Sequence, residues 1–154
     1  MSGPGPTTHT EMVIDAPVER VWDVLTDLPG WNVWNPTLFD VKGPAAGATS
    51  PWRPAAGTEV RMKLRMWKLK VPMRQQIRVV DPPRQFTWRS KQMLPAAAFD
   101  VVRTFRLEPV DENRTRFVQT EEGSGFLAKA IFALIGKEVT RGYDNLAKAL
   151  AEKV

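Results

Sequence analysis

The stretch AFDVVRTFRLEPVDENRTRFVQTEEGSGFL (residues 98–127) contains the changes of pattern that decide the fold. Apolar residues alternate with polar ones over 98–108 and again over 115–122, which is typical of half-buried strands. The segment DENR at 111–114 is rich in turn-forming residues and predicts a hairpin between them. Two glycines then end the pattern, and a helical period follows over 126–153. A strand hairpin followed by a long C-terminal helix is therefore expected.

The N-terminal part of the chain extends the same sheet. The segment DAPVERVWDVLTDL (15–28) has a capping residue, an early proline and apolar residues at helical spacing, and WNVWNP (31–36) predicts a second short helical turn. Further strands are predicted at 8–14, 38–42, 58–66, 70–80 and 85–92. We expect an α+β fold, with a curved antiparallel sheet of about seven strands wrapped around a long C-terminal helix and two short helices after the first strand.

The C-terminal helix has an apolar stripe that is expected to face the sheet. Gly136 and Gly142 interrupt the helix and predict a kink or a close contact. The stripe comprises Leu127, Ile131, Leu134, Ile135, Val139, Tyr143, Leu146 and Leu150.

Composition excludes several classes of chemistry. The chain has 154 residues, of which 43% are hydrophobic and 25% charged, as in one soluble globular domain. It has no cysteine and one histidine, His9, which excludes disulfides, thiolate zinc sites, multi-histidine metal sites and Ser-His-Asp or Cys-His nucleophiles. No metal and no cofactor are expected. The absence of a long apolar stretch and of a secretory leader predicts a cytoplasmic protein.

The expected organisation is a single domain over 8–154, preceded by a disordered tail at 1–7. The segment 43–57 is predicted to be a long loop, since 11 of its 15 residues are Gly, Ala or Pro. Trp52 lies within that loop.

Charge is distributed unevenly along the chain. The net charge is +5, yet residues 61–91 contain ten basic residues and one acid, a local charge of +9 that leaves −4 for the rest. This asymmetry fits either a solvated outer sheet face or a surface that docks on nucleic acid or an anionic membrane. Because aromatic residues there alternate with the charges, they are expected on the opposite face, which does not favour base stacking.

The order of these elements resembles the START-like helix-grip superfamily (SRPBCC), in particular its polyketide cyclase/dehydrase and lipid-transport branch. The resemblance implies a deep cavity between the sheet and the long helix. Members often carry His where Arg103 stands, His or Arg where Gln119 stands, and Phe where Gly123 stands, so the cavity is expected to have unusual polarity. The segments that carry the resemblance are APVERVWDVLTDL (16–28), WNP (34–36), DPPRQFTWR (81–89), FDVVRTFRLEP (99–109), TRFVQTEEGSGFL (115–127) and RGYDNLAKAL (141–150).

Three polar residues stand at inward positions of the last two strands: Arg103, Gln119 and Glu121. A buried Arg needs a carboxylate, and Glu121 is the nearest candidate. The pair is either a self-satisfied ion pair, an anchor for a polar group of a ligand, or a catalytic pair with Glu121 as general base and Arg103 as oxyanion stabiliser. The resemblance implies aldol closure and dehydration for the catalytic alternative. Tyr143 is either a packing residue or a further hydrogen-bonding group.

The main functional prediction is binding of a small hydrophobic or amphipathic molecule, lipid-like or polyketide-like, in the cavity. The alternatives are a polyketide cyclase, aromatase or dehydratase that uses Glu121 and Arg103, and a basic surface module. A monomer or homodimer is expected, with no nucleic acid partner and no stable membrane insertion. The candidate ligand-binding residues are Trp34, Met62, Leu64, Met66, Trp88, Phe99, Arg103, Phe105, Phe117, Gln119, Glu121, Phe132, Ile135, Val139 and Tyr143.

Overall fold

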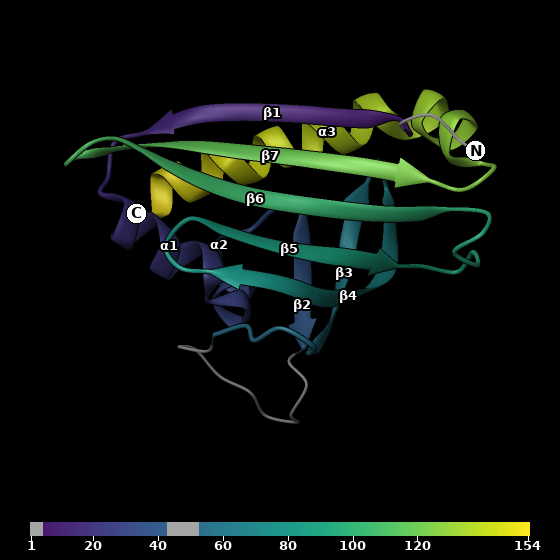
Figure 1. Cartoon of the computed structure of the whole chain (residues 1–154), viewed down its shortest axis with the longest axis horizontal. Coiled ribbons are helices and arrows are strands. Elements are labelled where there is room, and N and C mark those ends of the chain that lie inside the picture. The colour runs from purple at the N-terminus through teal and green to yellow at the C-terminus, as the bar shows by residue number, and fades with distance from the viewer. Residues whose placement is uncertain (1–4, 43–52) are drawn as a thin grey trace.

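The computed structural model describes residues 5–42 and 53–154 and contains one antiparallel sheet of seven strands in the order β1-β7-β6-β5-β4-β3-β2 (Figure 1). Strands β2 to β7 follow one another in the sheet, and β1, the first strand in sequence, pairs with β7, the last. The edges of the sheet are therefore β1 and β2. The strands are β1 (Thr7–Ile14), β2 (Leu38–Lys42), β3 (Glu59–Met66), β4 (Leu69–Asp81), β5 (Gln85–Lys91), β6 (Asp100–Asp111) and β7 (Arg114–Ser124).

Helices cover one face of the sheet. Figure 1 shows α3 (Ala128–Lys153) crossing behind β1 and β7, with the short helices near its C-terminal end. Those short elements are α1 (Val18–Thr26), the 3-10 turn η1 (Leu28–Gly30) and α2 (Trp31–Trp34). Within the described residues, none of the helices has the length and apolar character needed to cross a bilayer.

The predicted architecture is confirmed: seven strands, two short α-helices after the first strand and a long C-terminal helix. β1 begins at Thr7, inside the segment expected to be a tail. Residues 1–4 and 43–52, which hold much of the predicted tail and loop together with Trp52, lie outside the described residues.

One residue of the predicted helix stripe was assigned to the wrong face. Leu134 is 78% exposed. It shares its side of α3 with Arg141, seven residues further on, whose side chain is 66% exposed and forms an ion pair with Glu138 at 2.7 Å. The buried face passes instead through Val139 and Tyr143.

The two helix glycines differ in their surroundings. A Cβ on Gly142 would lie 3.0 Å from Thr37 Cγ2, and the Thr37 hydroxyl donates a hydrogen bond to the Gly142 carbonyl. The predicted close contact is therefore present at Gly142, where α3 meets the segment before β2. Among the residues that the structure describes, a Cβ on Gly136 would meet nothing within 4 Å.

Candidate functional site

A row of side chains crosses the inward face of the sheet at the middle of β5, β6 and β7. Trp88 lies directly opposite Arg103, and Arg103 lies directly opposite Glu121. Side chains that are directly opposite in antiparallel strands point to the same face. All three residues are buried, so this row lies in the interior on the side covered by α3.

Arg103 and Glu121 form a buried ion pair. The Arg103 Nε donates to Glu121 Oε2 at 3.1 Å, and Nη2 donates to the same oxygen at 2.7 Å. The side chains are only 2% and 11% exposed. Among residues 5–42 and 53–154, no donor bonds the other carboxylate oxygen, Oε1. The expected pairing is thus present, and one oxygen of the carboxylate remains for another group.

Tyr143 covers this ion pair from α3. The guanidinium carbon of Arg103 lies 3.1 Å from the centre of the Tyr143 ring, a cation–π contact. Burial raises the pKa of the Tyr143 phenol to about 12, and the nearby Glu121 carboxylate acts in the same direction while Arg103 opposes it. The phenol is therefore neutral at physiological pH and is available as a hydrogen-bond donor.

Gln119 connects the sheet to the same helix. Its Nε2 donates to the Thr10 hydroxyl at 3.2 Å and to the backbone carbonyl of Tyr143 at 3.0 Å. The side-chain carbonyl oxygen of Gln119 is buried and has no hydrogen-bond partner in the described part of the chain. Gln119 thus bonds to α3 through its amide nitrogen, while its amide oxygen remains available as an acceptor.

Two donors on the inward face of β4 and β5 also have no partner among the described residues. The indole Nε1 of Trp88 and the amide Nε2 of Gln75 are buried and unpaired among the residues that the structure describes. Gln75 lies opposite Ser90, whose hydroxyl donates to Gln75 Oε1 at 2.6 Å. An unpaired buried polar group costs about 1–3 kcal/mol, so such groups gain from an added partner; Asn35 Nδ2 and Gln76 Oε1 are in the same state among the described residues.

Aromatic rings surround the polar row. Trp88 contacts Phe105 with ring centres 4.9 Å apart and Trp31 with ring centres 5.7 Å apart. Phe86 stacks on Phe105 at 4.6 Å, and Phe117 lies parallel to Phe105 at 6.3 Å. The site is therefore a small polar group in an otherwise apolar, aromatic interior.

The structure brings together Arg103, Gln119, Glu121 and Tyr143, which the sequence had singled out. The other candidate residues fall into two groups. Those in the buried core are Met62, Leu64, Trp88, Phe105, Phe117 and Val139, and those that are half-buried are Trp34, Met66, Phe99, Phe132 and Ile135.

Phe99 and Phe132 form a separate contact with each other. Their ring centres are 6.2 Å apart, and a Cβ on Gly123 would lie 2.6 Å from Cε1 of Phe132. The helix residue Phe132 thus occupies the space above Gly123, at the position where the family resemblance predicts a bulky strand residue. The ring at this place comes from α3 instead of β7.

Gln75 and Ser90 were missed by sequence reasoning. Gln75 alternates with Met73 and Ile77 in β4, and this spacing by itself places its amide on the inward face. Ser90 follows Trp88 at the same even spacing. Both residues could have been found as polar residues that take the place of an apolar one in the alternating pattern of a strand.

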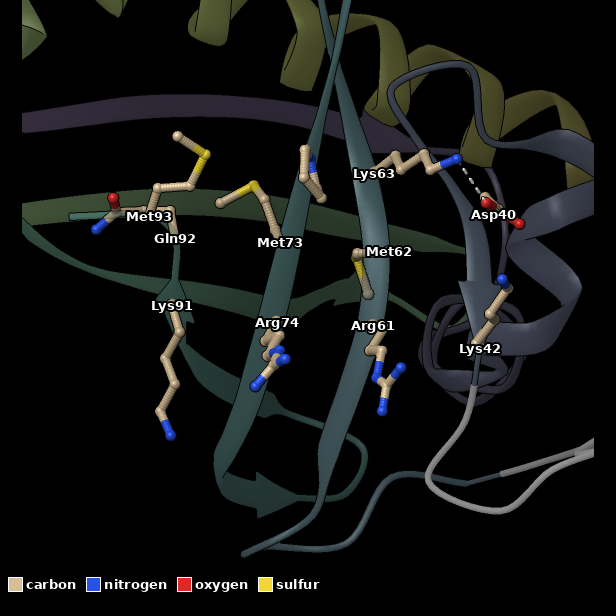
Figure 2. A pocket seen from close by; sticks show the side chains of 11 residues that line it. Asp40, Lys42, Arg61, Met62, Lys63, Met73, Arg74, Lys91, Gln92 and Met93 are labelled. Carbon is tan, nitrogen blue, oxygen red and sulfur yellow. Dashed lines mark ion pairs between the residues drawn. The ribbon is translucent and has the colours of Figure 1, made fainter. Parts of the chain in front are cut away.

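Three hollows, each lined by described residues, lie away from the polar row. One of about 570 Å³ lies at β2 to β5 and is shown in Figure 2. One of about 600 Å³ lies between β1 and α3, and one of about 210 Å³ lies at the connection between β5 and β6. Of the candidate residues, Met62, Phe132 and Phe99 line one each. At the polar row itself, Tyr143 covers Arg103 and occupies the space between sheet and helix, so the deep cavity that the resemblance implies is not open at this position.

Solved structures with the same fold cover almost the whole chain. An aromatase/cyclase, Zhui, from Streptomyces sp. R1128 is 17% identical, with 96% of this chain and 92% of that chain covered and a TM-score of 0.75. A Thermus thermophilus protein is 22% identical, with 96% and 95% covered and a TM-score of 0.73. A START superfamily protein from Mycobacterium smegmatis is 16% identical, with 96% of both chains covered and a TM-score of 0.72. At these identities the likeness establishes the fold.

A search among curated protein sequences finds no match. The family model described as polyketide cyclase / dehydrase and lipid transport matches residues 6–151, which include all the strands of the sheet and nearly all of α3. The chain therefore belongs to the polyketide cyclase/dehydrase and lipid transport family.

Proposed function

We propose that the chain binds a small hydrophobic or amphipathic molecule between the inward face of the sheet and α3, with the Arg103–Glu121 pair as its polar anchor. The observation that carries this proposal is a set of buried polar atoms on the inward face that have no partner among the described residues: Trp88 Nε1, Gln75 Nε2 and Gln119 Oε1. Each of them gains a hydrogen bond when a matching ligand group arrives, without losing one to the protein.

The identity of these atoms defines the ligand chemistry. Two unpaired donors, on Trp88 and Gln75, suit a carbonyl oxygen, and the unpaired acceptor on Gln119 suits a hydroxyl. The surrounding rings favour a flat apolar frame. A compound that carries carbonyl and hydroxyl groups on an aromatic or polyketide-like frame meets all of these requirements. A ligand that reaches the Arg103 guanidinium replaces its contact with the Tyr143 ring.

Binding is tested by native mass spectrometry of the purified protein, with extraction of any bound compound, and by titration with 6-hydroxy-1-tetralone, a bicyclic probe that has both groups. Trp88→Phe removes Nε1 and keeps an aromatic ring. We expect this change to weaken probe binding about tenfold, the loss of one hydrogen bond in a buried site. Trp22→Phe is the matched control, since Trp22 is a buried core indole that packs on Phe86. Absence of both a bound compound and probe binding, or equal weakening in both variants, contradicts the proposal.

A second candidate is cyclisation or dehydration of a polyketide chain. The specific observation in its favour is that both hydrogen bonds from Arg103 end on Oε2 of Glu121, so Oε1 is available as a base. In this scheme Glu121 takes a proton from the carbon next to a substrate carbonyl, and Arg103 stabilises the negative charge that develops on the carbonyl oxygen.

The catalytic candidate is tested with a poly-β-ketone thioester as substrate. Loss of turnover in Glu121→Gln with tetralone binding retained supports it, because the amide keeps the shape of the carboxylate but is no base. Turnover that is unchanged in Glu121→Gln rules it out.

A further inference from the structure

Four cations form a continuous row across the outer face of the sheet. Lys42 pairs with Arg61 across β2 and β3, Arg61 lies opposite Arg74, and Arg74 lies opposite Lys91 on β5. Neighbouring strands are 4.7–4.9 Å apart, so this cation row spans about 14 Å. Like charges at directly opposite positions of antiparallel strands destabilise the sheet. A row with three such steps is unfavourable unless negative charge is added.

The protein itself supplies little of that negative charge. Glu59 lies 3.9 Å from Arg74 and 3.4 Å from Lys91, so one carboxylate serves two cations. Within residues 5–42 and 53–154, neither Lys42 nor Arg61 forms an ion pair. With Glu59 counted, the cation row keeps three uncompensated positive charges.

Asp40, the other acid at this place, is already paired. Its carboxylate lies 3.0 Å from Lys63 Nζ, and the hydrogen bond from Lys63 lowers the pKa of Asp40 below its ordinary value. Figure 2 shows this pair at the β2 side of the hollow, with Lys42, the end of the cation row, beside Asp40. Asp40 therefore offsets part of the charge at the Lys42 end of the row, while Lys63 adds a cation to the hollow, so the five cations, Asp40 and Glu59 together leave a net charge of +3.

The cation row lines a hollow of about 570 Å³, to which Lys63, Pro72 and Met73 also contribute. In Figure 2 the side chains of Arg61, Arg74 and Lys91 extend side by side in the same direction from β3, β4 and β5. A concave surface with several convergent cations concentrates anions more strongly than a flat one.

We propose that this hollow binds a small anion that carries phosphate groups. The guanidinium forks of Arg61 and Arg74 fit the tetrahedral oxygens of phosphate with two hydrogen bonds each, and the two lysines at the ends of the row add point charges. The row is short and lies in an open hollow, which suits a compact polyanion. The cations of the row stand on the opposite face of the sheet from Arg103, and this proposal is independent of the function proposed above.

The test is titration calorimetry of the full chain with sodium pyrophosphate at low ionic strength. One saturable site is expected, weakened by added salt because exposed charges are screened. Arg61→Gln should weaken binding about tenfold, the loss of a charge-assisted hydrogen bond. Arg78→Gln is the matched control: it removes the same charge from an exposed position of β4 that does not line the hollow.

A second arm distinguishes a soluble phosphate from a lipid headgroup. The protein is sedimented with phosphatidic acid vesicles in the presence and absence of pyrophosphate. Release of bound protein by pyrophosphate shows that the hollow accepts the phosphate of either source and supports the proposal. The proposal is overturned by binding to vesicles or duplex DNA without pyrophosphate binding, by no saturable binding, or by equal weakening in Arg61→Gln and Arg78→Gln.

Discussion

The guanidinium of Arg103 on β6 is held between the Glu121 carboxylate on β7, at 2.7 Å, and the face of the Tyr143 ring on α3, with its central carbon 3.1 Å from the ring centre. A cation in this position is neutralised from the sheet and covered from the helix. Cation–π contacts of a desolvated guanidinium contribute about 2 kcal/mol. The contact therefore joins sheet and helix at the centre of the proposed ligand site.

Removing one partner of the buried ion pair should be far more damaging than removing both. Arg103→Met leaves the Glu121 carboxylate buried without its cation, and we expect the free energy of unfolding to fall by about 3–5 kcal/mol. The double variant Arg103→Met, Glu121→Leu replaces the pair with apolar groups of similar size and should recover most of that loss. Urea unfolding of both variants provides the measurement. A double variant as unstable as Arg103→Met would show that the pair itself supplies the stability.

Alkaline pH should destabilise the protein through Tyr143. The phenol has a pKa of about 12 in the folded protein and an ordinary value of 10.0. Between these values the unfolded chain has released this proton while the folded protein retains it, so stability is complete below pH 10 and falls as the pH rises through 12. The loss is about 1.4 kcal/mol per pH unit, or about 2–3 kcal/mol in all.

Tyr143→Phe is the control, because it has no phenol at this position but keeps the same lysines, which also titrate at alkaline pH. It should lose less stability than the wild type over the same pH range. Tyr143 is also the only tyrosine of the chain, so the tyrosinate absorbance reports on this residue alone. A midpoint near 10 in the folded protein would contradict its burial.

The helix glycines offer a matched pair of substitutions. Gly136→Ala adds a methyl group that meets nothing within 4 Å, and the gain in helix propensity should raise the free energy of unfolding by about 1 kcal/mol. Gly142→Ala must displace Thr37, whose Cγ2 would lie 3.0 Å from the new methyl group. We therefore expect a smaller gain or a loss, measured as the shift in Tm. Equal shifts would show that the Thr37 segment yields without cost.

The cation row should make stability depend on salt in the absence of any ligand. Added NaCl screens the repulsion between Arg61 and its neighbours Lys42 and Arg74, so the free energy of unfolding should rise at first with salt. Arg61→Gln should be more stable than the wild type at low salt by about 0.2–0.5 kcal/mol, because these groups are exposed. Its salt dependence should be smaller, and identical curves for both proteins would argue against repulsion in the row.

The sheet was predictable where one face is buried, because side chains alternate with a period of two. Val60, Met62 and Leu64 are buried as their alternation predicts, and so are Arg103 and Phe105 in β6. The same rule brings Arg103 and Glu121 to one face, and pairing of the last two strands as a hairpin brings them together. The family resemblance further predicts that the long C-terminal helix packs on the inward face of this sheet.

Strand register could not be predicted in the same way. The excess of basic residues is visible in the sequence, but the cation row depends on which residues lie opposite one another. The β2–β3 pairing is irregular between Phe39 and Lys42, and the β4–β5 pairing is irregular between Ile77 and Val79. Lys42 lies outside the basic stretch 61–91 and joins the row only through this register. An irregularity of this kind inserts an extra residue into one strand and shifts the register beyond it, and the spacing of apolar residues in the sequence does not show where this happens.

The anchoring of α3 is uneven, and this has a consequence for motion. Its buried residues are concentrated from Val139 onward, and the hydrogen bonds from Gln119 and Thr37 both reach the helix at positions 142–143. Towards its N-terminal end, Leu134 is largely exposed and Gly136 lines the hollow beside β1. Local opening of the native state therefore begins in this half, where amide hydrogens should exchange sooner than those of residues 143–150. If a ligand binds as proposed above, we expect it to enter at this end of the helix, while the C-terminal half keeps sheet and helix together.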